Sequence, residues 1–182
     1  MADAPVRTGR YSASMRVLGI DPGLRITGYG CVEGDPWRPA IVDAGVFRLD
    51  KVGKAADSAE SISARLVELD HDLRELIERV HPEAVAVEGM FTNLKHPATI
   101  IKMAHGRGVV LLAVRRAGLP LIELKPAAVK KSMTGSGQAT KEQMQASVQQ
   151  LFGLPELPKP ADVADALAIA VTAMQRAQVQ LG

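Results

Sequence analysis

The chain has 182 residues, 47% of them hydrophobic and 23% charged, which is enough for one substantial hydrophobic core and hardly enough for two. No apolar run approaches the ~20 residues needed to cross a bilayer, and residues 1–14 lack the apolar region of a secretion signal, so we expect a cytoplasmic protein without a membrane segment. The single cysteine, Cys31, excludes an internal disulfide and a cysteine-rich zinc site. We expect a flexible extension at residues 1–14 and one α/β domain at residues 15–182.

The first elements predicted along the chain form a β-meander. A short apolar strand ends in a turn that begins at Asp21 and contains Pro and Gly. In the second strand Gly28 and Gly30 share a face, which permits close approach by another segment. These strands are expected at residues 16–20, 26–32 and about 40–47.

Helices then alternate with strands, which predicts an α/β fold. The first helix has a capping-box pattern at residues 57–60 and apolar residues at helical spacing, and His81-Pro82 ends it. A proline-rich connector at residues 153–160 precedes the last helix. The expected elements are a helix at 58–80, a strand at 84–87, a helix at 97–117, a strand at 119–124, a short helix from 126, a glycine-containing loop at 133–139, and helices at 140–152 and 161–178.

Four carboxylates stand at the edges of apolar elements. Asp21 and Glu88 each follow the carboxyl end of a strand, where α/β folds place their sites. Asp162 and Asp165 are three residues apart in the last helix and project from one face. Taken singly, Asp21 can be a turn former, Glu88 a solvated residue after a strand, and Asp162 an acid favoured by the helix dipole. Asp165 lies past the cap among apolar residues, where an isolated carboxylate is costly.

Together the four acids suggest a divalent metal site beside a nucleic-acid groove. Hard cations such as Mg2+ take oxygen ligands, and pairs of them ~4 Å apart serve in-line displacement at phosphorus. Residues 95–141 contain nine lysines and arginines but only one acid, Glu123, a net charge of +8 in a chain whose total is +2. Such a basic stretch is the electrostatic footprint expected for binding to a phosphate backbone, so the residues favour a nuclease.

Six motifs, in this order, resemble the RuvC family of Holliday junction resolvases, and the resemblance runs from about Met15 to Met174. They are GIDPGLRITGYG at residues 19–30, VEGMF at 87–91, HGRG at 105–108, VK at 129–130, GSGQATK at 135–141 and ADVADALAIA at 161–170. The resemblance implies an RNase H-like fold, with a five-stranded mixed sheet whose first three strands are antiparallel, flanked by helices.

The resemblance also implies the site residues. The catalytic metal ligands would be Asp21, Glu88, Asp162 and Asp165, holding two Mg2+ ions per site, with Mn2+ as the alternative. DNA contact is expected for Phe91, Lys130, Lys141, Lys131 and Arg107. The sequence does not show which of Lys130 and Lys131 faces the phosphates, and a Phe91 folded back onto the core is the alternative to a DNA contact.

The implied activity is metal-dependent resolution of four-way DNA junctions in recombination and repair, by paired symmetric nicks that leave 5′-phosphate and 3′-hydroxyl ends. Because a four-way junction offers two equivalent strands, we expect a two-fold homodimer, with the helix at 97–117 as the candidate interface. A branch-migration motor of the RuvA and RuvB type is the implied partner. Three other functions stay open: a hydrolase of RNA–DNA hybrids, an actin-like ATPase, for which 182 residues are too few to build two lobes, and a metal-free junction-binding protein.

Overall fold

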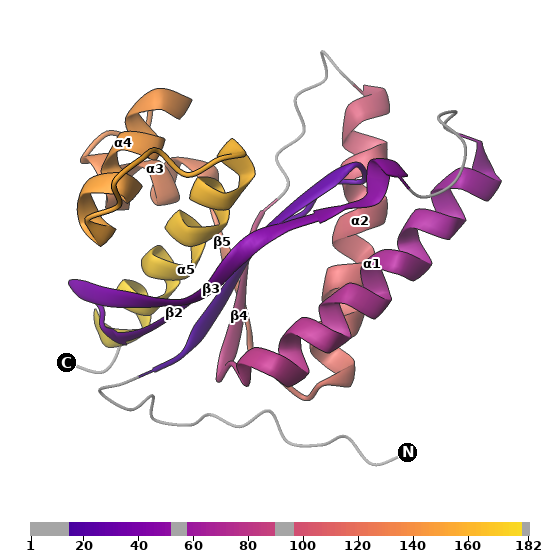
Figure 1. Cartoon of the computed structure of the whole chain (residues 1–182), viewed down its shortest axis with the longest axis horizontal. Coiled ribbons are helices and arrows are strands. Elements are labelled where there is room, and N and C mark those ends of the chain that lie inside the picture. Colours follow the sequence, from indigo (N-terminus) through magenta and orange to yellow (C-terminus); the bar gives the residue numbers. More distant parts are fainter. Residues whose placement is uncertain (1–14, 52–57, 90–96, 180–182) are drawn as a thin grey trace.

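A computed structural model describes residues 15–51, 58–89 and 97–179 of the chain (Figure 1). Its strands are β1 (Val17–Asp21), β2 (Ile26–Asp35), β3 (Arg38–Arg48), β4 (Ala84–Glu88) and β5 (Leu121–Leu124). They form one sheet in the order β3-β2-β1-β4-β5. β1, β2 and β3 pair antiparallel, whereas β4 runs parallel to β1 and to β5. The predicted meander and the five-stranded mixed sheet are thereby confirmed.

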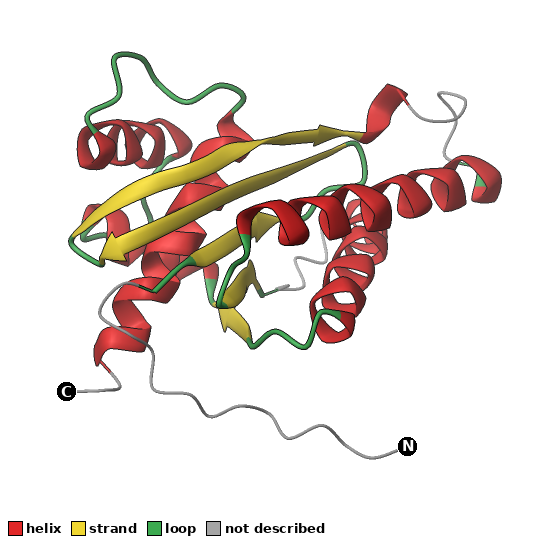
Figure 2. Cartoon of the chain, turned by 60° about the horizontal axis from the view of Figure 1, so that its bottom comes forward, coloured by secondary structure: helices red, strands yellow, loops and turns green. Residues whose placement is uncertain are grey.

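Helices cover both faces of this sheet. The helices are α1 (Ala59–Val80), α2 (Pro97–Arg116), α3 (Pro126–Thr134), α4 (Lys141–Phe152) and α5 (Ala161–Val179), and a 3-10 turn, η1 (Leu49–Lys51), follows β3. In Figure 1, α1 and α2 lie side by side at one face, and α5 lies on the other with α3 and α4 beyond it. Figure 2 shows α1 running along the sheet. Each face therefore has its own hydrophobic cluster. No helix within the described ranges is long and apolar enough to span a membrane.

Local signals set the ends of these elements, with small departures from the sequence prediction. The capping box expected at residues 57–60 is wrong by one position, because Ser58 is the N-cap of α1 and its hydroxyl accepts from the Ser61 N–H. The helix expected from residue 140 begins with a reciprocal cap between Thr140 and Gln143. α3 continues to Thr134, into the expected loop, and ends where Gly135 adopts a left-handed conformation with φ of 79°. The extension at residues 1–14 lies outside the described residues.

Glycines let α5 rest directly on the sheet. A Cβ at Gly28 would lie 2.2 Å from the backbone oxygen of Asp162, and one at Gly19 would lie 2.2 Å from that of Ala166. A side chain at either position would require the helix to shift, and without one the backbone of α5 closely approaches the backbones of β1 and β2. At Gly19 the helix presents two small buried residues, Ala166 and Ala170.

Candidate functional site

Two strand ends and one helix bring the acids together. β1 and β4 are parallel neighbours with Ile20 opposite Val87, so Asp21 and Glu88 end adjacent strands at the carboxyl edge of the sheet. Gly28 pairs with Asp21 across β1 and β2, and α5 touches the sheet at that glycine. The close approach of α5 therefore delivers the first turns of the helix, with Asp162 and Asp165, to the same edge.

The turn after Asp21 is held by one buried hydroxyl. Thr27 is fully buried, and its Oγ1 donates to the backbone oxygen of Gly23 at 2.7 Å and accepts from the Gly23 N–H at 3.2 Å. A satisfied polar pair of this kind inside a turn fixes the direction in which the chain leaves the strand. The position of Asp21 is thus set from both sides, by the β1 ladder and by the Thr27 contact.

The acids raise one another's proton affinity. Burial, and then the charges of Asp165, Glu88 and Asp162, raise the pKa of Asp21 to about 7, while Lys141 opposes the shift. Burial, then Asp165, raises the pKa of Glu88, and Lys130 acts against them. The pKa of Asp165 is raised by burial above all, with Lys141 opposing. These carboxylates form one coupled electrostatic group, in which a bound cation would relieve both repulsion and desolvation.

Three of the acids open into a common cavity of about 350 Å³. Asp21, Glu88 and Asp165 line it together with Lys130 and Lys141, and its remaining lining is Met103, Pro126, Val129, Met144 and Ile169. Asp162 is not among the lining residues and reaches the others through its charge. Lys131 is exposed and lies outside the lining as well. Of the adjacent lysines, Lys130 is therefore the one beside the acids, a choice that the sequence left open.

The donor set has the chemistry of a site for a hard divalent cation, although the side chains are not closed into a cage. Within the described ranges, no three His, Cys, Asp or Glu side chains come close enough to hold an ion as they stand. Asp21, Glu88 and Asp165 nevertheless line one cavity and offer only carboxylate oxygens, the ligands that Mg2+ and Mn2+ prefer.

Arg107 occupies a different environment from the one expected for a DNA contact. Its side chain is only 11% exposed. Nη1 donates to the backbone oxygen of Glu88 at 2.9 Å, and Nη2 pairs with the Glu123 carboxylate. A guanidinium so enclosed has little surface to offer a phosphate, and the DNA contact expected from the sequence stays a prediction. Sequence reasoning also missed the part played by Glu123, although its being the single acid of residues 95–141 was a signal.

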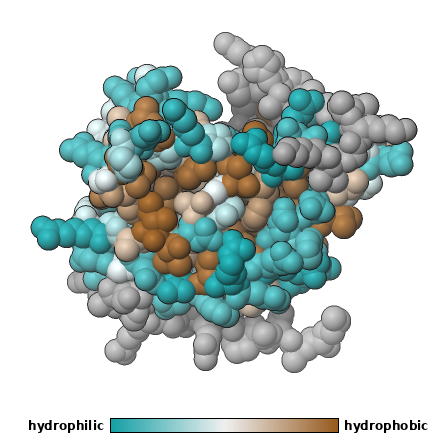
Figure 3. Space-filling model, viewed as in Figure 1, coloured by the Kyte–Doolittle hydropathy of each residue, from teal (hydrophilic) through white to brown (hydrophobic). Residues whose placement is uncertain are grey.

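Another predicted DNA contact, Phe91, lies outside the described residues. Figure 3 shows the face seen in Figure 1, with hydrophobic residues gathered across its middle and hydrophilic residues around them.

The half-buried Lys130 on α3 and the exposed Lys141 at the start of α4 supply positive charge next to the acids. Acids and bases, which are separated in the sequence, meet at this cavity.

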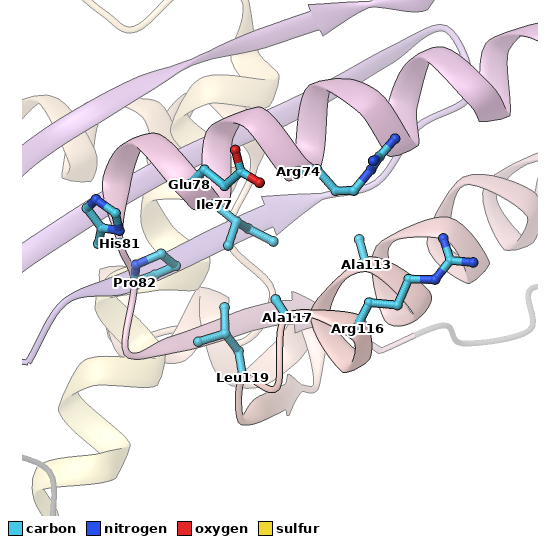
Figure 4. Close-up of a pocket in the computed structure, with 9 residues that line it drawn as sticks. All are labelled: Arg74, Ile77, Glu78, His81, Pro82, Ala113, Arg116, Ala117 and Leu119. Carbon is cyan, nitrogen blue, oxygen red and sulfur yellow. The ribbon is translucent and has the colours of Figure 1, made fainter. Parts of the chain in front are cut away.

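A larger cavity of about 480 Å³ lies at the opposite edge of the sheet. Figure 4 shows Arg74 and Glu78 on α1 across from Ala113 and Arg116 on α2, with Pro82 at one end. Its lining residues also include His81 and Leu119, which precede β4 and β5, so it lies at the amino ends of these strands. It contains none of the four acids, and parallel strands carry their sites at the other end. Size is therefore a poor guide here, and the smaller acidic cavity is the candidate site.

Comparisons with known proteins point to one family. The family model described as "Crossover junction endodeoxyribonuclease RuvC" matches residues 17–173. A relative of that name from Moorella thermoacetica is 45% identical over 157 residues, covering 86% of this chain and 89% of the relative. One from Chloroflexus aggregans is 44% identical over 158 residues, covering 86% and 91%.

Solved structures give the same result. T. thermophilus RuvC in complex with Holliday junction substrate matches with a TM-score of 0.80 and 32% identity, covering 92% of this chain and 97% of that one. The yeast mitochondrial Holliday junction resolvase Ydc2, 18% identical with a TM-score of 0.65 over 97% of this chain and 85% of that one, supports the fold alone. These neighbours have the RNase H-like fold, which confirms the predicted fold class. On the family model and the closely similar relatives together, the chain belongs to the RuvC family of crossover junction endodeoxyribonucleases.

Proposed function

We propose that this protein is a Holliday junction resolvase, an endonuclease that introduces paired symmetric nicks into four-way DNA junctions. The observation that carries the proposal is the convergence of Asp21, Glu88 and Asp165 on one cavity that also holds Lys130 and Lys141. Carboxylates suited to a divalent cation, placed next to lysines suited to a phosphate, are what phosphodiester hydrolysis requires. The junction is also the substrate named for the matching Thermus thermophilus complex.

The nucleases of this family depend on metal, and the four acids are the residues of this chain that would bind it. We assign Asp21, Glu88, Asp162 and Asp165 as the ligands of two Mg2+ ions per site, with Mn2+ as the alternative. When bound, such ions lower the pKa of a coordinated water and stabilise the leaving oxygen. Asp162, outside the cavity lining, would join the ligand set only after a rotamer change.

The chain's own residues orient the reacting groups. Lys130 and Lys141 attract the scissile phosphate to the acids, and the Glu88 and Asp165 carboxylates align the attacking water. The water oxygen forms a bond to phosphorus and gives up a proton to solvent, while the bond to the 3′-oxygen breaks and that oxygen takes up a proton, which leaves a 5′-phosphate and a 3′-hydroxyl. Lys141 is the first residue of α4, so backbone N–H groups of that helix end add to the attraction for phosphate.

Recognition of the junction rests on further predictions. Lys131 is exposed beside Lys130 and would contact the DNA backbone outside the cavity. Stacking of Phe91 on a base, worth about 1–3 kcal/mol by alanine substitution, remains a prediction from the sequence. A branch-migration motor of the RuvA and RuvB type as partner, and a cytoplasmic location, are also carried forward as predictions.

We further propose a homodimer that packs through α2. The helix carries an outward stripe in which Ile101 is 58% and Leu112 is 47% exposed. Gly108 lies on the same stripe, where an added Cβ would meet no heavy atom within 4 Å. Residues spaced in this way share one helix face, and a small residue between two large apolar ones allows a second helix to approach closely. A two-fold pair would present two sites to the two equivalent strands of a junction.

One experiment separates this function from the alternatives. A labelled four-way junction, an RNA–DNA hybrid and ATP are each incubated with the full chain, with and without Mg2+. We expect paired nicks in the junction only with Mg2+, and no comparable turnover of the hybrid or ATP. Preferential hybrid cleavage would indicate an RNase H-type hydrolase, and binding to the junction without cutting in any divalent metal would indicate a binding protein.

A further inference from the structure

Helix α2 contacts the ends of both acid-bearing strands through consecutive residues. Arg107 donates to the backbone oxygen of Glu88, the last residue of β4, at 2.9 Å. A Cβ at Gly106 would lie 3.4 Å from the backbone oxygen of Gly23, in the turn that follows Asp21. A single turn of α2 therefore lies against both strand ends from which Asp21 and Glu88 project.

The Arg107 contact is a buried, doubly anchored one. Besides the Glu88 oxygen, its guanidinium engages Glu123, which pairs with Val87 across β4 and β5. Enclosing an arginine is unfavourable unless its charge and donors are satisfied, and here a carboxylate and a carbonyl satisfy them. The side chain thus joins α2, the end of β4 and the edge strand β5 at a single point.

The geometry indicates that Arg107 affects Glu88 through the backbone of Glu88. The direction of a carbonyl is set by the ψ angle of its own residue, so a donor that fixes the Glu88 oxygen also restrains the direction in which the Cα–Cβ bond of Glu88 leaves the strand. The contact of Arg107 with Glu88 is to the backbone oxygen and not to the carboxylate. Arg107 is also absent from the cavity lining, which places it behind the site.

We propose that Arg107 is a positioning residue for the reaction: with Glu123 it clamps the Glu88 carbonyl, and so holds the Glu88 carboxylate toward Asp21 and Asp165 without touching DNA. The proposal rests on the function proposed above, because it assigns a role within that same site. It replaces the DNA contact expected from the sequence, and it gives Glu123 a role that its exposed position, at 58% for the side chain, would not suggest.

The test compares Arg107→Lys with Arg115→Lys. Lysine keeps the positive charge at position 107 but has a single nitrogen, which cannot reproduce the planar fork that spans two acceptors. Arg115 is an exposed arginine of the same helix and serves as the matched control. Glu123→Gln is a second variant, which keeps an acceptor but removes the charge. Four quantities are measured: the melting temperature, Mn2+ binding by calorimetry without DNA, junction affinity against salt in Ca2+, and the single-turnover cleavage rate at saturating junction.

For Arg107→Lys we expect about a 10- to 100-fold loss of cleavage rate and several-fold weaker Mn2+ binding, with junction affinity within about 3-fold and an unchanged salt slope. Glu123→Gln should show a smaller loss of the same kind, and Arg115→Lys none. A lower junction affinity, with a salt slope reduced by about 1, would mean a DNA contact and would overturn the proposal. So would a lower melting temperature with Mn2+ binding and cleavage unchanged in the folded protein, which is the result expected of a purely structural residue. Because Mn2+ binding needs no DNA, it tests the clamp even if the wild-type chain does not cut junctions.

Discussion

Replacing Asp21 by asparagine should stabilise the protein in the absence of metal while abolishing cleavage. Burial and the neighbouring carboxylates raise the pKa of Asp21 from 3.8 to about 7. The folded state therefore prefers the protonated acid, and its stability is complete below the unfolded pKa and declines as the pH rises from about 4 to about 7. Asparagine keeps the shape of the side chain and carries no charge at any pH, so it does not share this decline.

The size of the effect follows from the two pKa values. At pH 8 the shift of about three units corresponds to a loss on the order of 4 kcal/mol in the wild-type chain, at 1.36 kcal/mol per unit. At pH 5, where Asp21 is still protonated in the folded state, the loss is on the order of 2 kcal/mol. The difference in free energy of unfolding between Asp21→Asn and the wild-type chain should thus be about half as large at pH 5 as at pH 8.

Urea unfolding in EDTA at the two pH values measures this advantage. Glu156→Gln, which removes an exposed acid outside the cavity, is the control and should show no pH-dependent advantage. Mg2+ should restore stability to the wild-type chain at pH 8 more than to Asp21→Asn, because a cation that binds the native state stabilises it by an amount that grows with the ratio of its concentration to Kd, and the variant lacks one carboxylate ligand. An Asp21→Asn protein that is no more stable than wild type at pH 8, or equally favoured at both pH values, would refute the reasoning.

Four further outcomes are expected. Asp165→Asn should abolish cleavage and leave junction binding within a few fold in a gel-shift assay, because binding rests on the basic stretch; an equal loss of both would contradict that division. Gly28→Ala should lower both stability, by about 1–3 kcal/mol, and cleavage, since its Cβ would lie 2.2 Å from the Asp162 oxygen. Unchanged melting and turnover would show that α5 can move aside freely. Leu112→Arg should yield a monomer of near-normal melting temperature on size exclusion, as Leu112 is 47% exposed, and a persistent dimer would exclude this face of α2. Removing residues 1–14 should change the cleavage rate little, and a large drop in the folded truncated protein would assign that segment a role.

Local signals allowed much of the fold and three of the acids to be located from the sequence. Asp21 and Glu88 follow short apolar strands, and Asp165 lies inside an apolar helix, so their placement depended on neighbours in the chain. The choice between Lys130 and Lys131 depended on how α3 is rotated against α5, which no local pattern encodes. The role of Arg107 likewise depended on a contact between residues 19 apart in the chain, whereas any lysine or arginine in a basic stretch looks like a DNA ligand. Periodicity placed Gly28 and Gly30 on one face, but only the folded chain identifies α5 as the segment that approaches them.

The main-chain contact between α5 and the glycines of β1 and β2 bears on how such a site could be redesigned. Peptide groups, which have no rotamers, set the separation between the strand-borne acids and the helix-borne acids. The hydrophobic residues on the rest of α5 can then be exchanged for others of similar volume with little effect on that separation. An engineer who wished to adapt the site to a larger cation would gain little from exchanging aspartate for glutamate alone. Substitution of the strand glycines that contact α5 would change the separation more directly, because each added carbon would push the helix away from the sheet.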